Sequence, residues 1–182
     1  YHELAYKLAV QTTYPSWGYM VEQGATTVWE LWNSDTAPPE KMNSRNHFAL
    51  GSVGEWFYGY LAGIKPLADK PGFKLSVLAP KPAGDLEWAE GKINTDYGEL
   101  SSKWEKTATG LKMDVVIPAN SSAIVYVPKA GISKPTVKES GTVLLRGDDF
   151  VENSDGVNYI RLTADAVVFN VGAGTYSFVV EN

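Results

Sequence analysis

The stretch LKMDVVI at residues 111–117 has an apolar side chain at every second position, from Leu111 to Ile117. An alternation with a period of two is typical of a β-strand with one buried face. The stretch FKLSVLA at residues 73–79 follows the same pattern. The sequence therefore predicts half-buried strands in both stretches.

More segments of this kind fill the rest of the chain after Pro71, and Gly, Pro, Asn and Asp residues typical of turns separate them. They cover residues 86–89, 100–104, 123–127, 143–145, 157–162, 166–171 and 175–180. Because many short strands follow one another without helices between them, we expect an antiparallel β-sandwich or jelly roll.

The chain before this region has a helical period. Apolar side chains recur at helical spacing in residues 46–62, with Asn46 as the expected cap and Gly63 as the expected end of the helix. Residues 1–10 look like the middle of another helix without a capping residue, which suggests a fragment of a longer chain. The change of period near Lys65 predicts an α+β chain with two domains, residues 1–65 and 66–182.

Three glycines interrupt the helix predicted at residues 46–62, namely Gly51, Gly54 and Gly59. Each costs up to about 1 kcal/mol relative to alanine inside a helix. We therefore expect another backbone to lie close to this helix.

Composition argues against several classes of function. A net charge of −5 without a basic cluster argues against a nucleic-acid partner, since such binding depends on Lys and Arg side chains. No apolar run approaches the roughly 20 residues that span a bilayer, so we expect no membrane partner. The absence of cysteine removes disulfides and thiolate chemistry. We expect no cofactor and no metal, while the compartment, cytoplasmic or exported, stays open.

Residues 14–47 combine aromatic side chains with isolated polar groups. The aromatic ones are Trp17, Trp29 and Trp32, and the polar ones are Glu30, Asn43, Asn46 and His47. Indole faces suit the C–H surface of a sugar ring, and the polar groups suit its hydroxyls. This mixture is typical of a carbohydrate pocket.

Several motifs in this region resemble one family. YPSWGYM at 14–20, GATTVWELW at 24–32 and MNSRNHFALGSVGEW at 42–56 resemble the end of the (α/α)6 catalytic barrel of bacterial α-L-rhamnosidases in glycoside hydrolase family 78. PGFK at 71–74 and GDLEWA at 84–89 resemble the β-sandwich that follows that barrel. The resemblance is good to about Pro128 and loose beyond it.

The resemblance implies an inverting hydrolase that removes terminal α-L-rhamnose from glycosides or polysaccharides. Glu30 occupies the position of the family's general base, and His47 that of a residue in contact with the rhamnose. Trp17 and Trp32 are expected to shape the same pocket. In the family the general acid lies in earlier barrel helices, so the isolated chain is expected to be inactive unless Glu3, Glu22 or Glu55 substitutes for it.

Other interpretations stay open beside this one. The sandwich would be a non-catalytic carbohydrate-binding module if aromatic side chains such as Trp88 and Tyr97 formed an exposed array, or a structural brace for the barrel. Trp88 and Trp104 are expected in the core. The acidic runs at residues 147–149 and 153–156 resemble calcium loops, but turns explain them with fewer assumptions.

The helices of the first domain also raise the question of what covers them. Helices taken from a barrel without the remainder of that barrel would expose aromatic and aliphatic faces. We therefore expect the isolated chain to self-associate, or its N-terminal third to be remodelled relative to the barrel.

Overall fold

A computed structural model describes residues 1–41 and 44–182 of the chain. Met42 and Asn43 lie outside the described residues, and the predicted sugar contact of Asn43 lies there with them. The chain divides into two compact units, residues 1–56 and 57–182, and each is described by itself. The domain boundary predicted after Lys65 stays a prediction.

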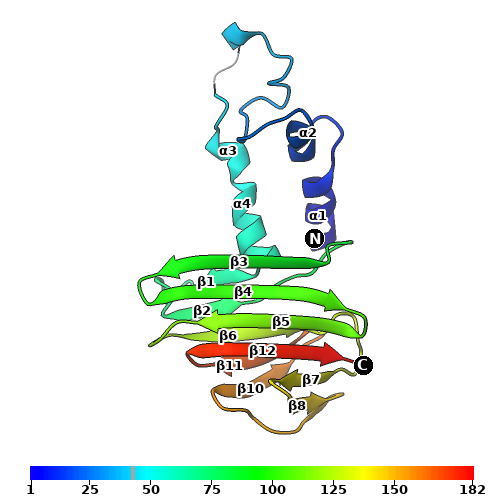
Figure 1. Cartoon of the computed structure of the whole chain (residues 1–182), viewed down its shortest axis with the longest axis vertical. Helices are drawn as coiled ribbons and strands as arrows, with labels where there is room; N and C mark the ends of the chain where they lie inside the picture. The colour runs from blue at the N-terminus through cyan, green and yellow to red at the C-terminus, as the bar shows by residue number, and fades with distance from the viewer. Residues whose placement is uncertain (42–43) are drawn as a thin grey trace. The chain divides into compact units, whose positions relative to one another are not determined.

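The first unit consists of short helices joined by long connections (Figure 1). They are α1 (His2–Val10), α2 (Trp17–Glu22), the 3-10 turn η1 (Pro39–Lys41), α3 (Phe48–Gly51) and α4 (Val53–Trp56). Ser16 caps α2, because its hydroxyl accepts a hydrogen bond of 2.9 Å from the backbone N–H of Tyr19. Tyr1 is the N-cap of α1, and its side chain makes no capping hydrogen bond.

The helix predicted at residues 46–62 is divided into three turns: α3, α4 and a π-helical turn, η2 (Phe57–Leu61), which belongs to the second unit. The cap predicted at Asn46 is wrong, since His47 is the N-cap and has an extended backbone. The backbone N–H of Asn46 instead donates a hydrogen bond of 3.0 Å to the Ser44 hydroxyl. Asn46 therefore belongs to a local turn that precedes the helix.

The close approach expected at the helical glycines is not found. Within the described residues, a Cβ added to Gly51 or Gly54 would meet nothing within 4 Å, and one added to Gly59 would meet only the Lys65 side chain. The close approach is at Gly63, where an added Cβ would lie 2.1 Å from the nitrogen of Pro80. Gly63 has a φ of +79°, so it ends the helical stretch as predicted.

The second unit is a two-sheet β-sandwich (Figure 1). One sheet has the order β1 (Ile64–Pro66), β2 (Leu75–Leu78), β6 (Ser122–Pro128), β11 (Ala166–Val171) and β10 (Val157–Leu162). The other has the order β3 (Trp88–Thr95), β4 (Gly98–Thr107), β5 (Gly110–Ile117), β12 (Gly174–Glu181), β7 (Thr136–Glu139), β8 (Thr142–Arg146) and β9 (Asp149–Phe150). Every predicted strand is found, and β1, β7 and β9 are additional.

Two details of the sheets differ from the prediction. The strand predicted at residues 86–89 begins at Trp88 and runs to Thr95, because it pairs over its whole length with β4. The sheets are antiparallel except for one pair, β2 and β6, which run parallel. The long connection between these two strands passes through the other sheet and makes the parallel pairing feasible.

The core lies between the inner faces of the two sheets. Phe169 of β11 and Phe178 of β12 stack across it with ring centroids 5.6 Å apart. Trp104 of β4 is fully buried, and its indole N–H donates a hydrogen bond of 2.7 Å to the Leu61 carbonyl. The core position predicted for Trp104 is confirmed. The one predicted for Trp88 is wrong: its side chain is 58% exposed, on the outer face of the edge strand β3.

The acidic runs form turns, as predicted. Gly147 and Asp148 lie between the paired strands β8 and β9. Asp155 and Gly156 lie inside a bridge that joins Ser154 to Val157. Within residues 1–41 and 44–182, no group of three or more His, Cys, Asp or Glu side chains is placed to hold a metal ion. Over the same residues, no helix has the length and apolarity that crossing a membrane requires.

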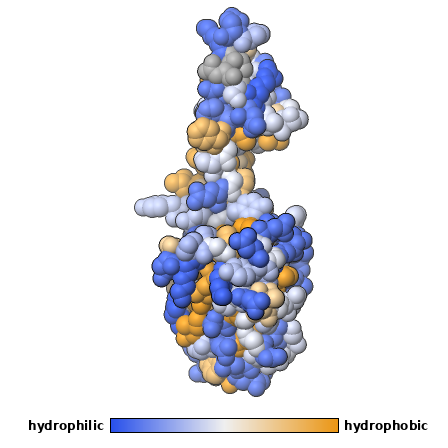
Figure 2. All heavy atoms as spheres, turned by 90° about the vertical axis from the view of Figure 1, so that its left-hand side faces the viewer, coloured by the Kyte–Doolittle hydropathy of each residue, from blue (hydrophilic) through white to orange (hydrophobic). Residues whose placement is uncertain are grey.

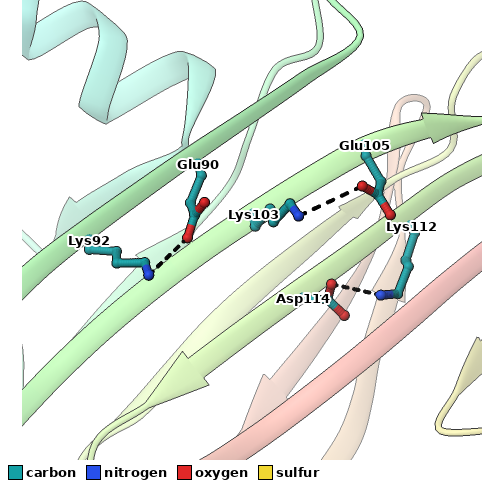
Figure 3. Close-up of polar contacts among 6 residues, drawn as sticks. All are labelled: Glu90, Lys92, Lys103, Glu105, Lys112 and Asp114. Atoms are coloured by element: carbon teal, nitrogen blue, oxygen red, sulfur yellow. Dashed lines mark hydrogen bonds and ion pairs between the residues drawn. The ribbon is translucent and has the colours of Figure 1, made fainter.

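Alternating charges cover the outer face of β3, β4 and β5 (Figure 3). Along the strands the ion pairs are Lys92–Glu90 at 3.0 Å, Lys103–Glu105 at 3.7 Å and Lys112–Asp114 at 2.9 Å. Across the strands Glu90 lies opposite Lys103, Lys103 opposite Asp114, and Glu105 opposite Lys112. Opposite charges thus meet in both directions, which favours this register and keeps the face polar.

Asp114 is the carboxylate of this face with a shifted pKa. Desolvation raises the pKa of Asp114, but hydrogen bonds from Lys112 and Ser177, together with the charges of Lys112 and Lys103, outweigh it. The pKa of Asp114 therefore lies below its ordinary value of 3.8. A carboxyl group with a depressed pKa in the folded state stabilises the fold above its unfolded-state pKa and loses that effect as the pH falls.

We expect the substitution Asp114→Asn to lower the free energy of unfolding at pH 7 by less than about 1 kcal/mol, because the pair is partly exposed. The difference between the two proteins should shrink as the pH falls below 3.8, where Asp114 becomes protonated in the unfolded state first. Urea unfolding at a series of pH values measures this. Asp148→Asn, in an exposed turn, is the control, and an equal loss in both variants would contradict the prediction.

Candidate active site

The segment around Glu30 pairs with the segment that precedes α3. The backbone N–H of Glu30 donates a hydrogen bond of 3.1 Å to the Ser44 carbonyl. The backbone N–H of His47 donates one of 2.8 Å to the Val28 carbonyl. These two bonds hold the two irregular segments side by side, although they are far apart in the sequence.

This pairing brings Glu30 and His47 together. Their side chains are 24% and 30% exposed, and 3.9 Å separates the Glu30 Oε1 atom from the His47 Nε2 atom. That separation is longer than the 2.7–3.2 Å or so of a protein hydrogen bond. The carboxylate of Glu30 and the imidazole of His47 are therefore neighbours that do not share a direct hydrogen bond.

The second ring nitrogen of His47, Nδ1, has unusual surroundings. It is buried and has no hydrogen-bond partner within the part of the chain that the structure describes. Phe48 stacks on the same ring, with centroids 5.3 Å apart and an interplanar angle of 18°. A buried polar atom left unpaired costs about 1–3 kcal/mol, so Nδ1 is a position at which a partner from outside the described residues would be favourable.

The three tryptophans of the predicted pocket have different surroundings. Trp29 is only 5% exposed and belongs to the core of the first unit. Trp17 and Trp32 are half-buried and meet edge to face, with centroids 5.4 Å apart. The indole N–H of Trp17 donates a hydrogen bond of 3.0 Å to the Leu50 carbonyl, which connects α2 to α3. Trp17 therefore has a structural contact in addition to the sugar contact that was predicted.

Two contact residues of the first unit were not predicted from the sequence. One is Phe48, which the position next to His47 in the chain could have indicated. The other is Asp35, whose carboxylate accepts a hydrogen bond of 2.9 Å from the Tyr19 hydroxyl. This hydrogen bond, with desolvation and the negative charge of Asp35, raises the pKa of Tyr19. The predicted sugar contact Asn46 is exposed, and its role stays a prediction.

The described residues thus combine a helical unit that carries a carboxylate, an imidazole and indoles with a β-sandwich in the same chain. Two family models give the particular family. The model of the bacterial alpha-L-rhamnosidase 6 hairpin glycosidase domain matches residues 1–61, and that of the bacterial alpha-L-rhamnosidase C-terminal domain matches residues 63–142. The chain belongs to the bacterial α-L-rhamnosidase family.

Individual relatives agree. An alpha-L-rhamnosidase of Formosa agariphila is 45% identical over 97% of this chain, which covers 18% of that protein. The solved alpha-L-rhamnosidase from Dictyoglumus thermophilum matches all of this chain with a TM-score of 0.84 and 38% identity, over 19% of its own length. The Streptomyces avermitilis alpha-L-rhamnosidase complexed with L-rhamnose matches 97% of this chain with a TM-score of 0.77 and 32% identity, over 16% of its own length.

These comparisons also bear on the architecture. The predicted α+β chain, with few helices from the end of a six-hairpin barrel followed by an antiparallel β-sandwich, is confirmed. The chain spans less than a fifth of the length of the relatives it matches, namely 18% and 16% of two of them. It corresponds to one part of such enzymes.

Proposed function

We propose that this chain is the part of an inverting α-L-rhamnosidase that supplies the general base, Glu30, for the hydrolysis of terminal α-L-rhamnose. One observation carries the proposal: Glu30 lies 3.9 Å from His47, whose buried Nδ1 atom has no partner among the described residues. A carboxylate beside an imidazole is the pair of groups that suits a water molecule and a sugar hydroxyl. The solved relative complexed with L-rhamnose supports a ligand of this kind.

In this mechanism Glu30 takes a proton from water while the oxygen of that water attacks the anomeric carbon of rhamnose. A carboxylic acid on the other face of the sugar ring gives its proton to the glycosidic oxygen, and the bond to the leaving group breaks. The two carboxyl groups of an inverting glycosidase lie roughly 6.5–9.5 Å apart to leave room for the water. The remainder of the barrel in the parent chain would supply that acid.

His47 would bind the sugar, and Trp17 and Trp32 would shape the pocket. Because the Glu30 segment and the His47 segment share backbone hydrogen bonds, a hydroxyl bound by His47 would be held at a fixed distance from the base. Such positioning is worth much of the rate enhancement of an enzyme. Phe48 would keep the imidazole ring in its plane.

The sandwich would act as a brace beside the barrel. A linear array of exposed rings would favour a polysaccharide-binding module, but Trp88 and Tyr97 lie at opposite ends of β3. A strand of eight residues is roughly 26 Å long, so these two rings cannot stack on neighbouring sugar units. The brace therefore fits the described residues better than the array.

We expect Glu30→Gln in the full-length parent to lower kcat for p-nitrophenyl α-L-rhamnopyranoside by about 10²–10⁴-fold, because the amide cannot accept the proton. Glu40→Gln, an exposed residue of η1, is the control and should keep full activity. Product analysis by NMR during the first minutes should show the inverted anomer. If the parent stays active after Glu30→Gln, Glu30 is not the general base. If the isolated chain is active, the expectation that the general acid lies outside this chain is wrong.

We expect His47→Ala in the parent to lower kcat/KM by about tenfold, the effect of losing one hydrogen bond to the sugar. Binding of L-rhamnose to the inactive Glu30→Gln parent, measured by calorimetry, should weaken by a similar factor. Unchanged rhamnose affinity in the doubly substituted protein would show that His47 does not contact the sugar. Asn46→Ala, on an exposed neighbouring side chain, tests the other predicted contact in the same way.

Without the remainder of the proposed barrel, the isolated chain exposes apolar side chains of the first unit. Leu4 and Leu8, one turn apart on α1, are 60% and 55% exposed, and Phe48 is 87% exposed. We expect the chain to self-associate at micromolar concentration, and Leu4→Glu with Leu8→Glu to reduce the association measured by light scattering. Val151→Glu, an exposed position in the sandwich, is the control. A monodisperse monomer of the unmodified chain would contradict this prediction.

A further inference from the structure

The sandwich has a hollow at the end where three of its connections meet. The β1–β2 connection, the β3–β4 hairpin and the β5–β6 turn surround an open cavity of about 550 Å³. Its polar and aromatic lining consists of Lys70, Lys74, Tyr97, Asn120, Ser121 and Ser122. Figure 2 faces the end of the sandwich at which β3 and β5 finish, the left-hand end in Figure 1.

Hydrogen bonds hold the walls of this hollow in place. The backbone N–H of Ser122 donates a hydrogen bond of 3.1 Å to the Lys74 carbonyl. This bond joins the β5–β6 turn to the β1–β2 connection. The Ser121 hydroxyl donates to the Pro118 carbonyl at 2.6 Å and tightens the turn. In the hairpin, the backbone N–H of Tyr97 donates to the Thr95 hydroxyl at 3.1 Å. The backbone of the hollow is therefore formed before any ligand arrives.

The charge of the hollow is opposite to that of the chain. Its lining contains two lysines and no carboxylate, whereas the chain has a net charge of −5. Lys70 and Lys74 are exposed, and neither has an ion pair with another described residue. The Nζ atom of Lys74 lies 5.9 Å from the centroid of the Tyr97 ring. Two ammonium groups and an aromatic face are thus available in one place.

We propose that this hollow is a binding site for an anionic sugar unit, distinct from the site around Glu30. Lys70 and Lys74 would bind its carboxylate or sulfate group, and the ring of Tyr97 would contact the apolar face of the sugar. Asn120 and Ser122 would form hydrogen bonds with its hydroxyls. The choice of a sugar over another anion rests on the proposed function, because the substrate of a glycosidase brings further sugar units with it.

Two lysines are too few for a phosphate backbone, whose binding scales with the number of neutralised phosphates. They match one negative group on one sugar. A neutral sugar would gain nothing from the positive charge of the two ammonium groups, and a small anion without a sugar ring would make no contact with the face of Tyr97. The hollow therefore selects for both features in one ligand.

The experiment is a titration of the isotope-labelled chain that carries Leu4→Glu and Leu8→Glu to limit self-association, followed by NMR through the backbone amides of Tyr97, Gly98, Asn120 and Ser122. The ligands are sodium glucuronate, glucose 6-sulfate, methyl glucoside and sodium acetate. We expect at least one of the charged sugars to bind about tenfold more tightly than the neutral sugar and acetate, the effect of one charge-assisted hydrogen bond. Comparing the two charged sugars identifies a carboxylate or a sulfate as the preferred group.

Substitutions then test the residues. The double substitution Lys70→Met and Lys74→Met should lower the affinity for the charged sugar by about tenfold or more. Tyr97→Ala should also lower this affinity, whereas Tyr97→Phe should not. Lys134→Met, an exposed lysine outside the hollow, is the matched control. Equal binding of methyl glucoside, equal binding of acetate, or an unchanged affinity in the lysine variant would each overturn the inference.

This test separates the inference from the proposed function. Charged-sugar binding needs no catalysis, so the chain can show it even if the parent has no rhamnosidase activity, and the hollow would then be a sugar site of another enzyme. Rhamnosidase activity lost on Glu30→Gln, together with no charged-sugar binding, would leave the proposed function intact and remove the hollow as a site.

Discussion

The hydrogen bond from the indole of Trp104 to the Leu61 carbonyl is the contact on which the second unit depends. The ring of Trp104 fills the core between the two sheets, while its N–H satisfies a carbonyl at the end of a helical turn that the helix itself leaves without a partner. The end of η2 is therefore fixed to the core of the sandwich. Gly63 then turns the chain into β1, and the parallel pairing of β2 with β6 completes the sheet.

The candidate active site depends on a different kind of constraint. Glu30 and His47 lie outside regular helices, and their positions follow from backbone hydrogen bonds between two irregular segments. Such segments carry function in many proteins because they present side chains that a helix would space by its own period. The proposed base and the proposed sugar contact thus share one local support.

Pattern in the sequence predicted the sandwich well, because burial of one face imposes the period of two that residues 111–117 display. The sequence pattern gave wrong predictions where tertiary contacts determine the local structure. The hydrogen bond between His47 and Val28 moved the helix start from Asn46, and the edge position of β3 left Trp88 exposed. Glu30 was predicted from family motifs, yet no local pattern indicates its distance from His47, since that distance depends on pairing between segments far apart in the chain.

The strand order of the larger sheet determines when that sheet can form. The last strand, β12, lies between β5 and β7 and pairs with both. Until residues 174–181 leave the ribosome, the edge of β5 has no partner and the sheet exists as two separate pieces. The larger sheet therefore cannot close before residues 174–181 are available, and the long-range pairing makes its formation slow. During synthesis the open edge of β5 is the surface that a chaperone would need to protect.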